Sequence, residues 1–170
     1  MLTFATPTDE VQATELMQPC LIRVVDNIRK HIETLPWRSE YLEQVSWPAH
    51  STADQRQQVR DLAAQLQEAT PEAAEAIRQR LAELPTPSPL YQLKLTAIAQ
   101  NGADSQASHT AMLEVWELCF AVCFRNYQTD QPASVDPALL HDDGEVNWLA
   151  LDEKAKAVVE RAIDGAIAAT

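Results

Sequence analysis

The chain has 170 residues, with 25 Asp and Glu against 13 Lys and Arg, so its formal net charge is −12 at pH 7. Hydrophobic residues make up 46% and charged residues 22%, proportions typical of a folded globular protein rather than a disordered one. The length fits a single domain over residues 1–170. Phosphate contacts need clustered Lys and Arg, so the acidic balance excludes a broad nucleic-acid surface and disfavours anionic membranes.

The sequence predicts no membrane span, no secretory leader and no cofactor loop. The longest apolar run, 115–124, is interrupted by Glu117 and falls short of the roughly 20 residues that a membrane helix needs. The N-terminus reads MLTFATPTDE and lacks the basic and apolar regions of a signal peptide. Three cysteines make no disulfide framework, and three glycines argue against a glycine-rich phosphate loop. We therefore expect a cytoplasmic protein with reduced thiols and no cofactor.

The N-terminal segment predicts one long amphipathic helix that ends near Pro36. Thr8 is a suitable N-cap and is followed by two acidic residues, which favour the start of a helix. Pro19 lies inside the stretch and is expected to kink or restart the helix, because it lacks a backbone N–H. Beyond Pro19, apolar residues recur at helical spacing: Leu21, Val24, Val25, Ile28, Ile32 and Leu35.

Residues 51–84 predict a projecting helical hairpin within the domain. Ser51 and Thr52 open its first helix, with Asp54 three residues after Ser51 as a variant capping box. Thr70 followed by Pro71 opens its second helix. The apolar seam between the two helices is thin, so this hairpin is a candidate surface for a partner or a second copy of the chain.

Two short segments on either side of the hairpin predict a minor antiparallel sheet. Residues 41–47 are aromatic and β-branched, which favours a strand. Three prolines mark 85–89 as a linker of extended backbone. Residues 91–98 then alternate between apolar and polar side chains, as a strand does, although a helix starting at Pro89 is the alternative.

The C-terminal half predicts two further helices. A turn at Asn101-Gly102 and a loop over 103–108 lead to a helix from Thr110 to Tyr127, which is apolar around most of its circumference. We expect it to be the central helix, or to be completed by another subunit. A polar connection over 128–147 precedes a last helix capped by Asp152. The predicted fold is mainly α, with about five helices, or α+β with a two-stranded antiparallel sheet.

Two cysteines on the central helix raise the question of a ligand. Cys119 and Cys123 are spaced i,i+4 and share a helix face with Trp116. This face predicts core packing, and the alternative is a pocket for an apolar small molecule or pigment, lined by Trp116, Cys119, Phe120 and Cys123. No further Cys or His motif supplies the four ligands of a zinc site, so no metal is expected.

Two groups of residues are candidates for contact with a partner. Asp136, Asp142, Asp143 and Glu145 form an acidic patch that suits a basic face. An EF-hand is excluded there, because the first and twelfth positions of the loop are not oxygen ligands. Trp37 with Arg38 is a pair of the type enriched in interface hot spots.

No catalytic motif is recognised in the sequence. His109, Glu114 and Glu117 suggest an acid–base group, but a polar helix start with a solvent-facing stripe explains them more simply. The first hypothesis is a non-enzymatic protein-interaction module, an adaptor, regulator or assembly factor that binds a protein through helical and acidic surfaces. The alternatives are a helical domain that binds an apolar small molecule or pigment, and an enzyme with an unrecognised site.

Overall fold

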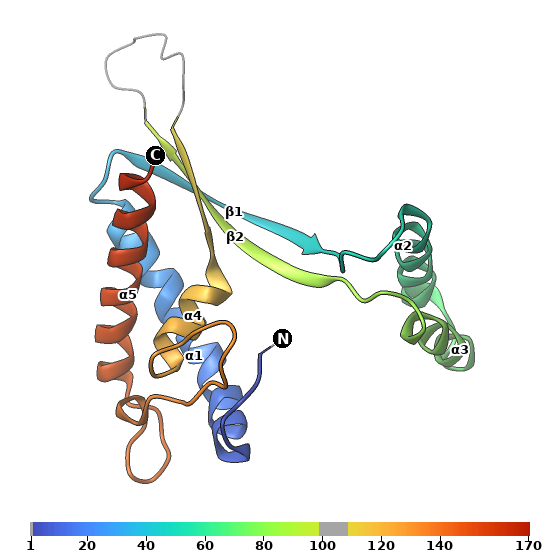
Figure 1. Ribbon diagram of the computed structural model, residues 1–170, viewed down its shortest axis with the longest axis horizontal. Coiled ribbons are helices and arrows are strands. Elements are labelled where there is room, and N and C mark those ends of the chain that lie inside the picture. The colour runs from blue at the N-terminus through green and yellow to red at the C-terminus, as the bar shows by residue number, and fades with distance from the viewer. Residues whose placement is uncertain (1, 99–108) are drawn as a thin grey trace. The chain divides into compact units, whose positions relative to one another are not determined.

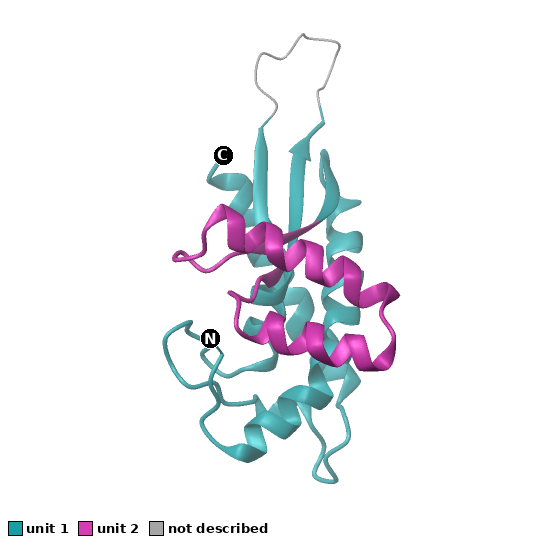
Figure 2. Ribbon diagram, turned by 90° about the vertical axis from the view of Figure 1, so that its right-hand side faces the viewer, with its two compact units in different colours: residues 1–42, 91–170 teal, residues 43–90 magenta. Residues whose placement is uncertain are grey.

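The computed structural model describes residues 2–98 and 109–170, so the turn expected at Asn101-Gly102 and the loop expected over 103–108 lie outside the described residues. The described part contains five α-helices and a three-stranded antiparallel sheet (Figure 1). This confirms the mainly helical fold with a minor sheet. The contacts divide the chain into unit 1, Met1–Leu42 with Tyr91–Thr170, and unit 2, Glu43–Leu90 (Figure 2).

Helix α1 spans Pro7–Ile32 without interruption. Its N-cap is Thr6 rather than Thr8, because the Thr6 hydroxyl accepts the backbone N–H of Asp9 and Pro7 occupies the first turn. The expected restart at Pro19 is wrong. Leu16 and Cys20, before and after Pro19, are both fully buried on the core side, so one continuous helix buries apolar surface on both sides of the proline.

The sheet has the strand order β1-β2-β3, with β1 over Trp37–Ser46, β2 over Ser88–Ala97 and β3 over Thr110–Glu114. The segment after Pro89 is therefore a strand and not a helix. Strands β2 and β3 are antiparallel, with Leu95 opposite Ala111. The sheet has three strands where two were expected, and β1 and β3 are its edges.

The third strand replaces the expected start of the central helix. Residues from Thr110 to Glu114 pair with β2, and α4 covers only Val115–Cys123. The apolar pattern of 110–127 is compatible with a helix, but backbone pairing with β2 overrides that local preference. Glu114 ends the strand and caps the helix, since its carboxylate accepts the N–H of Glu117 at 3.1 Å.

Helix α5 spans Trp148–Ala168 and runs parallel to α1. The guanidinium of Arg23 lies 5.0 Å from the centre of the Trp148 ring, and further along Asn27 donates to Asp152 at 3.1 Å. The expected cap at Asp152 is wrong. Asn147 caps the helix by accepting the N–H of Ala150, and Asp152 instead holds α5 to α1. A short 3₁₀ turn, η1, covers Pro137–Leu139.

The core of unit 1 lies between the sheet and helices α1, α4 and α5. Helix α4 packs against both α1 and α5, as expected for a central helix. The core side chains include Leu93 and Leu95 from β2, Val115 and Val122 from α4, and Val159 from α5. Within residues 2–98 and 109–170, no helix is both long enough and apolar enough to cross a membrane.

Unit 2 contains the helical hairpin. Helix α2 spans Ala53–Glu68 and α3 spans Pro71–Ala82. The capping box of α2 is formed by Thr52 and Gln55, not by Ser51 and Asp54, because the longer Gln side chain reaches back to the N–H of Thr52 at 2.9 Å. The cap that Thr70 provides for α3 is confirmed.

Candidate functional site

The hairpin of unit 2 buries little apolar surface of its own. Val59 and Leu62 on α2 and Ala74 on α3 are its buried apolar side chains, and three more along the seam are half-buried: Leu66, Ile77 and Leu81. A helix pair in solution normally buries a wider apolar stripe. The seam therefore holds α2 to α3 with few contacts.

The entrance to the hairpin carries a tryptophan with an unused donor. The guanidinium of Arg60 lies 5.8 Å from the centre of the half-buried Trp47 ring. The indole Nε1 of Trp47 is buried and has no hydrogen-bond partner within the described residues. A buried N–H without an acceptor is costly, so this side chain adds little to the stability of the hairpin.

Trp37 and Arg38 stand at the start of β1. The Trp37 ring is half-buried and packs against the core of unit 1, whereas Arg38 is exposed. Arg38 lines a shallow pocket of about 250 Å³ with Glu40 and Thr96. Trp37 therefore contributes to the core of unit 1, whereas Arg38 is accessible to a partner.

Asp136 is engaged inside unit 1. Its carboxylate accepts the N–H of Ala138 at 3.0 Å and the Nζ of Lys154 at 2.8 Å. Burial alone would raise the pKa of Asp136, but the hydrogen bonds from Lys154 and Ala138 outweigh burial and hold the pKa below its usual value. Asp136 thus makes contacts within unit 1, unlike the other three acidic candidates, which are exposed to solvent.

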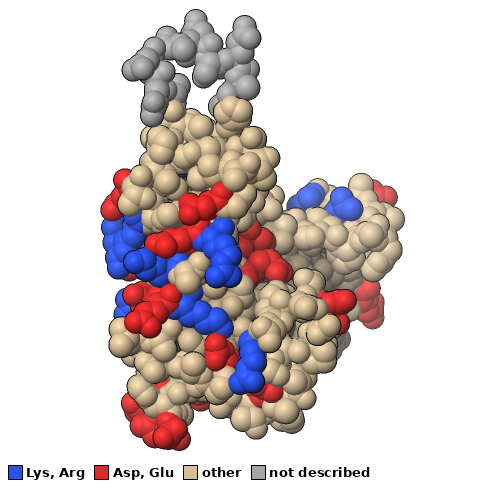
Figure 3. Space-filling model, turned by 60° about the vertical axis from the view of Figure 1, so that its left-hand side comes forward, with Lys and Arg blue, Asp and Glu red and all other residues tan. Residues whose placement is uncertain are grey.

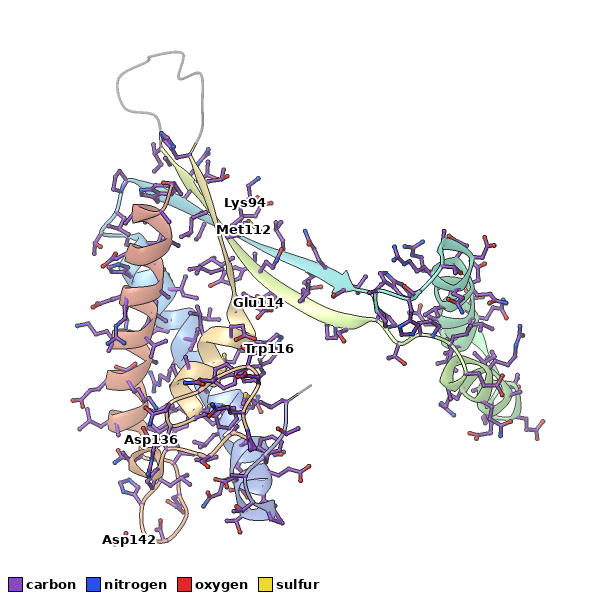
Figure 4. The ribbon with its side chains drawn as sticks, viewed as in Figure 1. Lys94, Met112, Glu114, Trp116, Asp136 and Asp142 are labelled. Carbon is purple, nitrogen blue, oxygen red and sulfur yellow. The ribbon has the colours of Figure 1, made fainter. Side chains whose placement is uncertain are left out.

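Asp142, Asp143 and Glu145 are exposed in one tight turn before α5. The N–H of Glu145 donates to the Asp143 carboxylate at 3.0 Å, and Gly144 adopts φ +86°, a conformation that glycine allows without strain. Figure 3 shows acidic side chains at this lower end of unit 1, and Figure 4 labels Asp142 there. The turn presents three carboxylates to the solvent.

The two groups of partner candidates lie at opposite ends of unit 1. Trp37 follows the C-terminal end of α1, and the acidic turn precedes the N-terminal end of α5. Because α1 and α5 run parallel, the 21 residues of α5, roughly 30 Å of helix, separate them. One small epitope cannot include both groups.

The four residues expected to line an apolar pocket pack into or against the core. Cys119 and Cys123 are fully buried, and the thiol of Cys20 donates to the carbonyl O of Cys119 at 3.5 Å. Hydrogen bonds with Cys119 and Cys123, together with burial, raise the pKa of the Cys20 thiol. Trp116 and Phe120 are half-buried against the same core. The proximity of Cys20 to the other two thiols was not predicted from the sequence, because that contact joins α1 to α4.

The suggested acid–base group of His109, Glu114 and Glu117 is not assembled. Both oxygens of Glu114 accept backbone N–H groups, from Tyr91 at 2.9 Å and from Glu117 at 3.1 Å. His109 is exposed and precedes the far end of β3. Five residues of extended strand, roughly 16 Å, separate it from Glu114.

A pocket beside α4 in unit 1 was not anticipated from the sequence. It has a volume of about 580 Å³ and lies between α4, the turn after α4 and α5. Its apolar lining consists of Leu118, Ala121, Phe124, Ala157, Val158 and Ala162. Arg125, Lys154 and Arg161 supply cations at its rim. Lys154, Ala157 and Arg161 are spaced i, i+3 and i+7 and therefore share one face of α5. In the sequence alone, this spacing cannot be distinguished from an ordinary solvent-facing side of a helix.

A second groove, of about 330 Å³, runs between α1 and α5. The amide of Asn27 donates to Asp152 and to the carbonyl O of Arg23, and Nε2 of His31 lies 2.8 Å from Asp164. These polar groups satisfy one another across the helix pair. Figure 3 shows Lys and Arg side chains interspersed with acidic ones on this face of unit 1. We interpret the groove as part of the α1–α5 packing.

Over residues 2–98 and 109–170, no group of three or more His, Cys, Asp or Glu side chains has a geometry that could hold a metal ion. Comparison with models of protein families, with curated proteins and with solved structures finds no match to this chain.

Proposed function

We propose that the protein is a non-enzymatic protein-interaction module, an adaptor, regulator or assembly factor, that holds a protein partner through unit 2. The observation that carries this proposal is the small core of that unit. Residues 43–90 form a compact unit of their own, yet Val59, Leu62 and Ala74 are its buried apolar side chains.

The energetics of such a hairpin favour a covering surface. Burying a Val or Leu side chain contributes about 1.5–3 kcal/mol, whereas ordering the backbone of each residue costs about 1–2 kcal/mol. Helices α2 and α3 contain 16 and 12 residues. A partner that covers the half-buried seam would add the missing apolar contact.

The exposed faces of α2 and α3 suit a protein more than a lipid or a nucleic acid. They combine glutamines, alanines, three exposed arginines and several acids without a basic stripe. Exposed small side chains beside the seam, such as Ala63 and Ala73, allow the backbone of a partner helix to approach closely. The acidic turn at Asp142 offers a second contact for a basic face, and three unpaired buried cysteines support a cytoplasmic setting.

The test changes the exposed surface of unit 2 and leaves its seam intact. Ala63→Glu with Ala73→Glu adds bulk and charge at exposed positions that flank the seam, one helical turn from Val59 and Ile77, and keeps good helix formers. Ala168→Glu, at an exposed position of α5, is the matched control. The tagged chains are purified from native cells at modest salt and analysed by native mass spectrometry.

The expected result is one stoichiometric partner retained by the wild type and by Ala168→Glu and lost by the double variant. Retention of that partner by the double variant would place the contact outside the hairpin and contradict the proposal. A wild-type chain that carries no protein partner would contradict it as well.

A further inference from the structure

We propose that the pocket between α4 and α5 is a binding site for a small amphipathic carboxylate, a molecule with one anionic head and an apolar body. All of the lining residues belong to unit 1, so this site is independent of the partner binding proposed for unit 2.

The size and floor of the pocket suit an apolar body. Its volume of about 580 Å³ lies within the range of roughly 300–1,000 Å³ typical of small-molecule sites. Ala121 from α4 and Ala157 from α5 leave space where larger side chains would close the gap between the helices. Phe124, which is 1% exposed, and Val158 form an apolar base.

The charge of the pocket is opposite to that of the chain. Acidic residues outnumber basic ones by 25 to 13 in the sequence, yet the lining contains Arg125, Lys154 and Arg161 against a single acid, Asp136. A local excess of positive charge in an acidic protein favours an anionic occupant.

Two of the three cations remain available to a ligand. Lys154 is held by Asp136 at 2.8 Å and by the carbonyl O of Phe124 at 3.2 Å. Arg125 and Arg161 form no ion pair with any described residue. A guanidinium presents paired N–H donors that match the two oxygens of a carboxylate. These two arginines are therefore the expected contacts of the anionic head.

The backbone around Arg125 is fixed before any ligand binds. Its N–H donates to the carbonyl O of Ser134 at 2.8 Å. Asn126 adopts φ 51°, a left-handed conformation that Asn tolerates better than most residues, and reverses the chain. The reversal packs the Tyr127 ring 6.0 Å from that of Phe124. A site built on fixed backbone loses less conformational entropy on binding.

The same features disfavour other occupants. A nucleic acid needs cations spread along the length of its phosphate backbone, whereas these three cations are confined to one pocket. A bare inorganic anion would leave the apolar floor unused. A neutral apolar molecule would bury arginine charge without a counter-ion, which costs free energy.

Dodecanoate is the probe, measured by isothermal titration calorimetry at low ionic strength against the full-length protein. We expect saturable binding at one site and none with acetate, which lacks the apolar body. Arg161→Gln should weaken dodecanoate binding about tenfold or more, because a charged hydrogen bond is lost. Ala157→Leu should weaken it comparably by filling the pocket while all charges remain.

Arg78→Gln, an exposed arginine on α3, is the matched control and should leave binding unchanged. Thermal unfolding of each variant verifies that the fold persists. The proposal is overturned if dodecanoate does not bind, if acetate binds as well as dodecanoate, or if dodecanol binds as tightly as the carboxylate. It is also overturned if Arg161→Gln and Ala157→Leu both bind like the wild type.

Discussion

The side chain of Lys154 joins three parts of unit 1. Its backbone belongs to α5, and its Nζ donates to the carbonyl O of Phe124 just after α4 and to the carboxylate of Asp136 before η1. Both charged groups are largely screened from solvent, with side-chain exposures of 26% and 22%. Charge-assisted hydrogen bonds in such surroundings are stronger than those at an open surface. This pair therefore holds the segment after α4 against α5.

Replacing Asp136 by Asn should destabilise the fold in a pH-dependent way. We expect a loss of about 1–2 kcal/mol in the free energy of unfolding at neutral pH. The folded-state pKa of Asp136 is lowered, so its contribution is fully present above the unfolded pKa, about 4, and is lost as pH falls through the folded value. Urea unfolding of wild type and Asp136→Asn at a series of pH values measures this difference.

The matched control is Asp142→Asn, which changes an exposed carboxylate of the acidic turn. Its stability should stay close to that of the wild type across the pH range. An equal loss in both variants, or a difference for Asp136→Asn that persists unchanged at acidic pH, would mean that the Lys154 pair does not stabilise the fold.

The three cysteines should be chemically inert in the folded protein. Cys20, Cys119 and Cys123 are fully buried, and only a thiolate reacts readily. A colorimetric thiol reagent should detect no reactive cysteine in native buffer and three in denaturant. Rapid modification of even one thiol in native buffer would show that the α1–α4 contact opens.

At the scale of elements, the junction between β3 and α4 separates what was predictable from what was not. The apolar residues of 110–127 were recognised, and α4 is indeed buried. The boundary at Glu114 was missed, because it depends on pairing with β2 rather than on local preference. Thr70 before Pro71 was a clear cap, whereas Thr6 and Asn147 have neighbours that are equally good caps in sequence alone.

Glu114→Ala should weaken this junction. The substitution removes the acceptor for the N–H groups of Tyr91 and Glu117. Loss of an N-cap costs about 0.5–2 kcal/mol, and the freed N–H of Tyr91 adds to that cost. Chemical denaturation measures the change. Glu117→Ala removes an exposed acid from the same helix turn and should cost clearly less; equal costs would contradict the capping role.

In the whole molecule, the individual helices and strands could be predicted from the sequence better than the tertiary contacts between them. The helical hairpin, the long first and last helices and two of the strands follow from periodicity. The contact between the three thiols depends on how α1 packs against α4, and the pocket depends on how α4 packs against α5. The local sequence pattern of a single helix does not determine such packing. The separation of Trp37 from the acidic turn likewise follows only from the parallel packing of α1 and α5.

Hydrogen exchange should distinguish the two units. Amides of α2 and α3 are expected to exchange faster than those of α1, α4 and α5, because few buried contacts resist their local opening. Mass spectrometry of peptides from 53–68 and 71–82, compared with peptides from 115–123, measures this. Equal protection in both sets would show that unit 2 needs no covering surface, and would remove the main support for its role in partner binding.

Among the described residues, strand β1 has a neighbour on one side only, so the backbone groups of alternate residues along its ten-residue length point to an open edge. Such an edge invites further strands and, through them, aggregation. Glu40 and Glu43 are exposed on this strand, and the net charge of −12 on each copy of the chain opposes edge-to-edge pairing at neutral pH. That protection fades as the carboxylates are protonated and the net charge approaches zero near pH 4.6. The protein should therefore be least soluble in mildly acidic solution, where net charge no longer opposes self-association through the open edge.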